Sequence, residues 1–275
     1  MSEPPSDRMG KSWAFDRAVE CYDRTRTLAP DAMEAMLATL REELAGTDPV
    51  LEVGAGTGRL SIPLAQAGFR VFGVDLSGPM LRRLLEKAGD GARPEVIVGD
   101  ATALPLRSVA FGGALLFHVL HLVPNWPDVL RELDRVVRPG GAIVMGLGHI
   151  DGETDPTPGE VGEAFRRATG IERQFPGLVR TDAGRFDAVV RELGWESHPT
   201  PQIADVQSRS LEELIRELED GVWSWTWDLS EEERHDAAAA TRKEIRERYG
   251  DLDAPRTLES RIGVRSYRTA EGSRA

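Results

Sequence analysis

Cysteine is nearly absent from this sequence: its 275 residues include only Cys21. A single thiol excludes an intramolecular disulfide and any metal site built on several cysteines. Long apolar runs are absent too. No stretch approaches the roughly 20 uninterrupted apolar residues of a membrane-spanning helix, and residues 1–11 lack the apolar core of a signal peptide. We therefore expect a cytoplasmic protein without membrane insertion.

The sequence also lacks a dense block of basic residues. It contains 34 lysines and arginines against 46 aspartates and glutamates, which gives a net charge of −12. Nucleic acids and anionic membrane surfaces attract clustered positive charge, so this balance disfavours both as partners. We expect a small-molecule substrate and no nucleic-acid partner, while the composition leaves the oligomeric state open.

Glycine, by contrast, is concentrated at one point of the chain. A short, mostly apolar segment, Val50–Val53, is followed by glycine at every second position, Gly54, Gly56 and Gly58, and then by an expected helix over Leu60–Ala67. Because glycine has no Cβ, the chain can turn sharply there and a ligand can approach the backbone amides. This arrangement predicts a loop that binds a nucleotide-type cofactor.

The spacing of these glycines decides between cofactors. A dinucleotide fingerprint needs a further glycine where the sequence has Arg59 or Ser61. A P-loop is also excluded, because the only Gly-Lys-Ser, Gly10–Ser12, has Pro5 where the first glycine belongs. The pattern Glu-x-Gly-x-Gly-x-Gly, from Glu52 to Gly58, is instead typical of class I S-adenosylmethionine-dependent methyltransferases. The chain resembles that superfamily.

Further motifs of the superfamily follow in the same order. Phe69–Asp75 is expected to form a second strand, ending in an acid about twenty residues beyond the loop, where a ribose-binding carboxylate belongs. Val96–Ala101 resembles the third strand with its Gly-Asp-Ala. Phe111–His121 resembles the fourth strand and the residues that follow its carboxyl end. Leu130–Gly141 resembles the helix and Pro-Gly-Gly turn before a fifth strand, Gly141–Gly148. The resemblance is to the branch that includes ubiquinone and menaquinone methyltransferases.

The resemblance implies S-adenosyl-L-methionine as the cofactor. It implies that Asp75 binds both ribose hydroxyls, for which a carboxylate has two acceptor oxygens, and that Asp100 meets the adenine amino group. Glu52 either accepts a hydrogen bond from the cofactor or braces the loop. The cofactor-binding candidates are Tyr22, Glu52, Gly54, Ala55, Gly56, Gly58, Asp75, Leu76, Met80, Asp100, Ala101 and Phe117.

Besides Glu52, three of these candidates have an alternative, structural interpretation. Tyr22 lies in an amphipathic segment, Trp13–Leu28. In similar methyltransferases this segment covers the cofactor mouth, but its tyrosine can equally be a packing residue. Leu76 and Met80 either flank the adenine or belong to the core.

Two histidines follow the fourth strand and are the catalytic candidates. His118 and His121 are three residues apart, which places them near one face if the segment is helical. Imidazole titrates near neutral pH and can take a proton from a hydroxyl nucleophile. The alternative is packing and backbone hydrogen bonding without proton transfer. No further ligand cluster accompanies them, so we predict no metal site.

Strands alternate with helices from Val50 to Leu147, which predicts an α/β fold with right-handed crossovers. We expect a Rossmann-like, mostly parallel sheet of seven strands with helices on both faces. Trp195–Val206 holds the sixth strand, and the last strand, Arg261–Arg268, is antiparallel. Ligands of such sheets bind beyond the carboxyl ends of the strands. The predicted divisions are a disordered tail over 1–12, a methyltransferase core over 13–209 and 256–268, and a helical lid over 210–255.

The lid is the least typical part of the chain. Ser230 and the three glutamates after it predict a capped helix that runs to Tyr249. Before this helix lie Trp223, Trp225 and Trp227. These rings either form a wall for an apolar or aromatic acceptor or anchor the lid to the rest of the protein.

The resemblance implies an enzyme that transfers a methyl group from S-adenosyl-L-methionine to a small-molecule acceptor by in-line displacement. One alternative is a non-catalytic partner protein that binds S-adenosylmethionine or S-adenosylhomocysteine. Others are a family member that uses the cofactor for another reaction and a methyltransferase that acts on a macromolecule. The motifs do not identify the acceptor.

Overall fold

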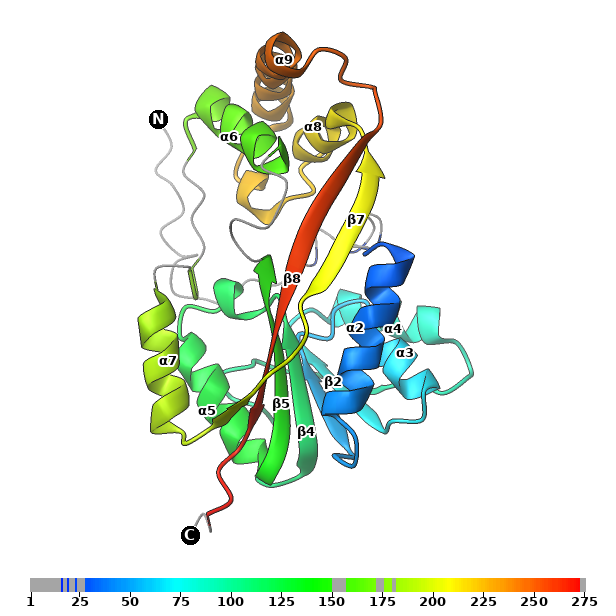
Figure 1. Cartoon of the computed structure of the whole chain (residues 1–275), viewed down its shortest axis with the longest axis vertical. Helices are drawn as coiled ribbons and strands as arrows, with labels where there is room; N and C mark the ends of the chain where they lie inside the picture. The colour runs from blue at the N-terminus through cyan, green and yellow to red at the C-terminus, as the bar shows by residue number, and fades with distance from the viewer. Residues whose placement is uncertain are drawn as a thin grey trace.

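Eight strands form one sheet in the computed structural model, which describes residues 16, 19, 23, 28–149, 157–171, 176–179 and 182–272 (Figure 1). The strand order is β3-β2-β1-β4-β5-β8-β6, and β7 pairs with the remaining length of β8. The strands are β1 (Val50–Val53), β2 (Val71–Asp75), β3 (Glu95–Val98), β4 (Phe111–Phe117), β5 (Val137–His149), β6 (Glu196–His198), β7 (Ile203–Arg209) and β8 (Arg256–Arg268).

The direction of the strands confirms the predicted fold class. β1 to β5 are all parallel, whereas β8 runs antiparallel to β5. The sheet is therefore a mostly parallel α/β sheet with an antiparallel last strand. The predicted tail, Tyr22 and most of the segment around it lie outside the described residues. No helix among those that are described has both the length and the apolarity to cross a membrane.

Helices cover both faces of the sheet. On one face lie α2 (Pro30–Glu43), α3 (Ser61–Gln66) and α4 (Gly78–Ala88), and on the other lie α5 (Trp126–Val136) and α7 (Ala183–Glu192) (Figure 1). Side chains alternate between the two faces along each strand. Leu115 of β4 packs in the cluster that contains α2 and α3, whereas Leu116 packs in the cluster with α5 and α7. Because both faces are covered, β4 is buried along its whole length.

The predicted sixth strand is two strands, which explains why the sheet has eight instead of seven. Pro199 and Pro201 separate β6 from β7, and proline has no N–H to donate to a strand ladder. β6 pairs with the carboxyl end of β8, and β7 pairs with its beginning. Between them, the Thr200 hydroxyl donates to the carbonyl of Val264 over 2.6 Å. The side chain thus replaces a backbone partner at the break.

Beyond the sheet, three helices share a separate hydrophobic cluster. They are α6 (Thr157–Thr169), α8 (Leu211–Glu219) and α9 (Glu231–Tyr249), which we call the cap. α8 and α9 belong to the predicted lid, whereas α6 precedes it in the chain. β7 and β8 run from the sheet to these helices as a two-stranded ribbon (Figure 1). Ser230 caps α9 through a reciprocal pair of hydrogen bonds with Glu233, as predicted.

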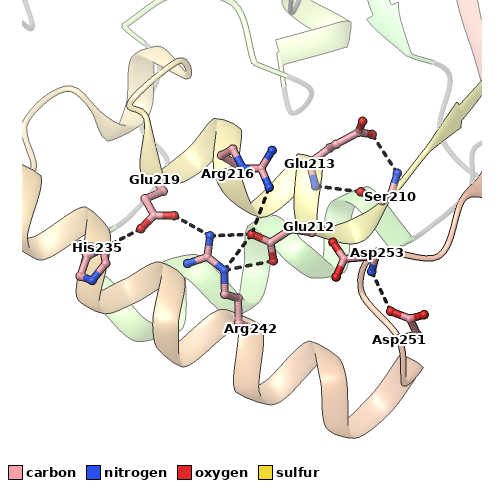
Figure 2. A network of polar contacts seen from close by, with 9 residues as sticks. All are labelled: Ser210, Glu212, Glu213, Arg216, Glu219, His235, Arg242, Asp251 and Asp253. Atoms are coloured by element: carbon pink, nitrogen blue, oxygen red, sulfur yellow. Dashed lines mark hydrogen bonds and ion pairs between the residues drawn. The ribbon is translucent and has the colours of Figure 1, made fainter.

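A charged network joins two helices of the cap (Figure 2). Arg242 of α9 donates to the Glu212 carboxylate over 2.8 Å and to Glu219 over 2.6 Å, both on α8. The other oxygen of Glu219 lies 2.7 Å from Nδ1 of His235. Hydrogen bonds from these two carboxylates raise the pKa of Arg242 above its usual range. One planar guanidinium thus holds two acids of the neighbouring helix.

Trp225 lies in the interior of the cap. It is 9% exposed, and its ring meets Phe165 of α6 edge to face, with centroids 5.9 Å apart. Trp227 is half-buried and donates from Nε1 to the carbonyl of Gly221 over 2.9 Å. For Trp225, the structure therefore favours the anchoring interpretation over an acceptor wall.

We expect Trp225→Ala to lower the free energy of unfolding by about 3–5 kcal/mol, because it leaves a cavity between α6, α8 and α9. Urea denaturation followed by circular dichroism measures this loss. Trp225→Phe is the matched control: it keeps an aromatic ring against Phe165 and is expected to lose less than half as much. A loss below about 1 kcal/mol for the alanine variant would contradict the anchoring role.

Candidate active site

The predicted site residues follow strands whose carboxyl ends meet at one edge of the sheet. Val53, the last residue of β1, pairs with Val74 of β2 and with Leu116 of β4. Asp75 ends β2 and is aligned with Val98 of β3. The glycine loop, Asp75, the segment with Asp100 and the segment after β4 therefore begin at the same level of the sheet.

The loop after β1 requires glycine. Gly54, Gly56 and Gly58 have φ angles of 76°, 53° and 83°, in the left-handed region that other residues rarely adopt. Space is also lacking: a Cβ on Gly54 would lie 2.1 Å from Cγ2 of Val119, and one on Gly58 would lie 2.7 Å from Cγ of Leu84. The loop is thus packed closely between α4 and the segment after β4.

Four amides of this loop already have acceptors. Gly54 and Ala55 both donate to the carbonyl of Val74, over 2.7 and 3.1 Å, and Gly58 donates to Ala55 over 2.9 Å. The amide of Gly56 donates to Oδ2 of Asp75 over 2.8 Å. These four amides are therefore not available as donors to a ligand. A ligand at this loop would be bound mainly by close contact with the backbone.

Asp75 is fixed by backbone amides on both of its oxygens. Besides the bond from Gly56, Oδ1 accepts from the amide of Ser77 over 2.8 Å. Burial raises the pKa of Asp75, against the effect of these two hydrogen bonds. Each carboxylate oxygen can accept a second hydrogen bond. The oriented carboxylate therefore retains the capacity to bind a pair of hydroxyls.

Glu52 lies under the loop in the middle of the sheet. Its side chain is 3% exposed, and burial raises its pKa to about 8, although Ser61 and the positive charge of Arg59 act in the opposite direction. Within the described residues, Oε2 of Glu52 and Oγ of Ser61 are buried without a hydrogen-bond partner. Buried polar atoms are usually satisfied, so this pair marks a place where a polar group or a water belongs.

Asp100 is oriented by its own loop. Its Oδ1 accepts from the amide of Thr102 over 2.9 Å and from the Thr102 hydroxyl over 2.8 Å. Gly99, just before it, donates to the carbonyl of Asp75 over 3.0 Å, which ties the two acidic segments together. Ala101 is half-buried and packs against the core.

The apolar candidates divide into core and surface. Met80 is 1% exposed and Phe117 is 6% exposed, so both side chains are core residues. Phe117 also fills the space beside Gly146, where a Cβ would lie 2.1 Å from the ring. Leu76 is 37% exposed and is the apolar candidate that a ligand can reach most easily.

Two acids from the amino-terminal part of the chain reach the site, and sequence reasoning missed both. Asp23 accepts from the Thr57 hydroxyl over 2.6 Å and from Nζ of Lys87 over 2.8 Å. Burial acts to raise the pKa of Asp23, but these hydrogen bonds outweigh it and lower the pKa. Asp16 accepts from the Ser77 hydroxyl over 2.5 Å. This part of the chain therefore contacts both the glycine loop and the end of β2.

The two histidines do not share a helical face. His118 directly follows β4 with a φ of 58°, in the left-handed region, whereas His121 lies in the short 3-10 helix η2 (Leu120–Leu122). Both side chains are half-buried. The condition for a shared face, a continuous helix, is not met, because the left-handed residue separates His118 from η2. Their catalytic role stays a prediction.

Comparison with known proteins agrees with this geometry. Residues 51–145, which run from β1 into β5, match the methyltransferase domain family. Over 132 residues the chain is 35% identical to malonyl-acyl-carrier-protein O-methyltransferase of Pseudescherichia vulneris, covering 48% of this chain and 51% of that protein. Over 136 residues it is 35% identical to demethylmenaquinone methyltransferase of Renibacterium salmoninarum, covering 48% and 55%. The chain thus spans about half the length of these curated relatives.

A solved structure extends the likeness in fold beyond the matched domain. Phosphoethanolamine N-methyltransferase 2 of Haemonchus contortus superposes with a TM-score of 0.55 at 17% identity, covering 93% of this chain and 57% of that one. Together, the matched domain, the two relatives and this likeness in fold confirm the resemblance to class I methyltransferases that the motifs indicate.

The raised pKa of Glu52 predicts a stability that depends on pH. Between the unfolded value of about 4.5 and the folded value of about 8, the folded protein keeps a proton that the unfolded chain releases. Rising pH therefore favours unfolding across this window, by up to about 1.4 kcal/mol per pH unit. Above pH 8 the effect levels off.

We expect the difference in unfolding free energy between the wild type and Glu52→Gln to fall from pH 5 to pH 8, since glutamine does not titrate. Urea denaturation at a series of pH values measures it. Glu95→Gln is the control, because Glu95 is exposed at the surface beside Arg70. A difference that is constant with pH would show that Glu52 is ionised in the folded protein.

Proposed function

We propose that the protein is an S-adenosylmethionine-dependent methyltransferase that methylates a small molecule. The observation that carries the proposal is the bond from the Gly56 amide to Asp75. It joins the glycine-rich loop to an oriented carboxylate that can accept from a diol. One structural neighbour supports the cofactor, since the Haemonchus contortus enzyme was solved in complex with S-adenosyl-L-methionine.

The residues at the sheet edge fit this cofactor. Packing against Val119 and Leu84 leaves no room for a Cβ at Gly54 and Gly58, and the buried oxygen of Glu52 has no partner within the described residues. In the proposal, Asp75 binds the ribose hydroxyls, Asp100 the adenine amino group, and the glycine loop contacts the methionine portion. Glu52 lies beneath the loop as a hydrogen-bond acceptor or a brace. Tyr22, which we also predicted, lies outside the described residues.

When bound, the cofactor supplies a methyl group that is already activated by positively charged sulfur. The protein's own residues then have to orient the acceptor and exclude water. In the proposal, the cap and the segment after β4 perform these tasks. If the methyl group is transferred to a hydroxyl, His118 or His121 takes up the proton of that hydroxyl.

The acceptor itself is proposed only as a small molecule. One relative is named for a malonyl-acyl carrier protein and another for demethylmenaquinone, and their matches cover about half of each protein. The cap, which has the three tryptophans, follows residue 145 and lies outside the matched domain. A non-catalytic binding protein, a family member with another reaction and a methyltransferase of macromolecules remain the alternatives. A location in the cytoplasm likewise remains a prediction from composition.

Isothermal titration tests the cofactor directly. We expect S-adenosylmethionine and S-adenosylhomocysteine to bind with micromolar affinity and NADH not to bind. Absence of binding by both sulfur compounds would refute the proposed function. Binding without release of S-adenosylhomocysteine across a broad panel of acceptors would favour the non-catalytic alternative.

Asp75→Ala should weaken S-adenosylmethionine binding by more than tenfold, because it removes the paired acceptors for the ribose hydroxyls. Asp90→Ala, at an exposed acid just beyond the end of α4, is the control and should bind as the wild type does. Unchanged affinity in Asp75→Ala would refute the assignment of the ribose site to β2.

The two interpretations of the histidines give different results once an acceptor is known. A general base predicts that alanine at His118 or at His121 lowers turnover by about 10²–10⁴-fold while cofactor affinity stays the same. Packing alone predicts turnover close to that of the wild type in both variants, provided that they remain folded.

A further inference from the structure

We propose that Glu132 and Arg135 of α5 are positioning residues for recognition of the adenine base. They hold the loop between β3 and β4 in the place where it presents Asp100. The proposal rests on the proposed function, because it concerns the same cofactor site. It assigns a role in specificity to two residues that stand outside the set of cofactor-binding candidates.

The two side chains form a bidentate ion pair, and together they bind both the amide and the carbonyl of one loop residue, Leu104. Nε and Nη2 of Arg135 donate to the two oxygens of Glu132, each over 2.7 Å. Oε2 of Glu132 accepts from the amide of Leu104 over 2.6 Å. Nη2 of Arg135 donates to the carbonyl of Leu104 over 3.1 Å, and Nη1 donates to the carbonyl of Leu106 over 2.8 Å.

The loop has few other means of support. Residues 99–110 contain no strand or helix, so no ladder of backbone hydrogen bonds holds them in place. The amide and the carbonyl of Leu104 are both bound by the pair on α5, and its side chain is buried in the core at 5% exposure. Val109, further along, donates to the backbone carbonyl of Arg135 over 2.9 Å. One turn of α5 thus supports the loop at several points.

The position of Leu104 is transmitted to Asp100 through a single hydrogen-bonded turn. The amide of Ala103 donates to the carbonyl of Asp100 over 3.1 Å, and Thr102 binds the Asp100 carboxylate with its amide and its hydroxyl. Pro105 packs against Gly99, where a Cβ would lie only 2.9 Å from the proline ring. A shift of Leu104 therefore moves the carboxylate and the residues on either side of it.

The chemistry of the pair explains why arginine and glutamate are suited to this role. The hydrogen bonds from Arg135, together with the amide of Leu104, lower the pKa of Glu132, so the carboxylate stays ionised near neutral pH. A guanidinium can reach one carboxylate and two carbonyls at the same time with a rigid, planar set of donors. A lysine has the same charge but a single nitrogen, and it lacks this geometry.

The test compares S-adenosylhomocysteine with S-inosylhomocysteine, in which a carbonyl replaces the adenine amino group. The carboxylate of Asp100 accepts from the amino group and repels the carbonyl. We therefore expect the wild type to prefer the adenosyl compound by at least tenfold in isothermal titration. In Arg135→Gln this preference should fall by at least fivefold, with a smaller change in affinity for the inosyl compound.

Arg131→Gln is the matched control. Arg131 lies one turn earlier on α5, and its ion pairs are with Asp128 over 2.9 Å and with Glu192 over 3.7 Å, both away from the loop. Its substitution removes the same charge from the same helix and should leave the preference unchanged. Arg135→Lys should behave like the glutamine variant. A preference equal to that of the wild type in Arg135→Lys would overturn the role of the bidentate ion pair.

A purely structural role gives a different result. Loss of stability alone would weaken binding of both compounds by the same factor and leave their ratio unchanged, which would overturn the proposal. If Arg135→Gln does not fold, the same measurement is made on Glu132→Gln, which removes the other partner of the ion pair. An unchanged ratio of the two affinities in that variant would also overturn the proposal. A wild type that binds neither compound would refute the proposed function itself.

Discussion

The lack of space around the loop from Gly54 to Gly58 is the constraint on which the rest of the structure depends. Val119 presses on one side of this backbone and Leu84 on the other, so β1, α4 and the segment after β4 approach each other more closely than side chains would permit. The same approach brings the Gly56 amide within reach of Asp75. The polar groups of the site are therefore oriented by backbone packing, and a ligand does not have to organise them.

Several carboxyl groups lie around this constrained loop. Burial raises the pKa values of Glu52 and Asp75, which favours their protonated forms. Asp23 accepts from Thr57 of the loop, and Asp16 accepts from Ser77, just beyond β2. Placing several acids in a buried region is unfavourable unless positive charge compensates them. Lys87 supplies one such charge. In the proposed function the cofactor supplies another, at sulfur.

The sequence was sufficient to predict the elements whose signals are local. The alternation of strands and helices, the capped start at Ser230 and the position of Asp75 follow from periodicity, turn residues and spacing. The third to fifth strands and Asp100 follow from the resemblance to the superfamily's motifs. Contacts between distant residues leave no such signal. The approach of Asp23 to Thr57 and the grip of Arg135 on Leu104 depend on side chains that meet only in the folded protein.

Some local signals were also misleading. The spacing of His118 and His121 suggests one helical face, but the left-handed conformation of His118 breaks the segment before η2 begins. The prolines in the Trp195–Val206 segment were recognisable as restrictions. Their effect, the division of one strand into β6 and β7, follows only from the length of β8, which is able to pair with both. The pairing of both strands with β8 therefore determines a division that the local sequence pattern does not specify.

The position of β8 also links the edge of the parallel sheet to the cap. Among the described strands β8 comes last in the chain, yet it lies inside the sheet between β5 and β6. Without β8, the long strand β5 would have an unpaired edge, of the kind that can pair with other chains. β8 pairs with β5 in the sheet and with β7 in the ribbon that leads to the cap. Protection of that edge and attachment of the cap therefore depend on the same strand.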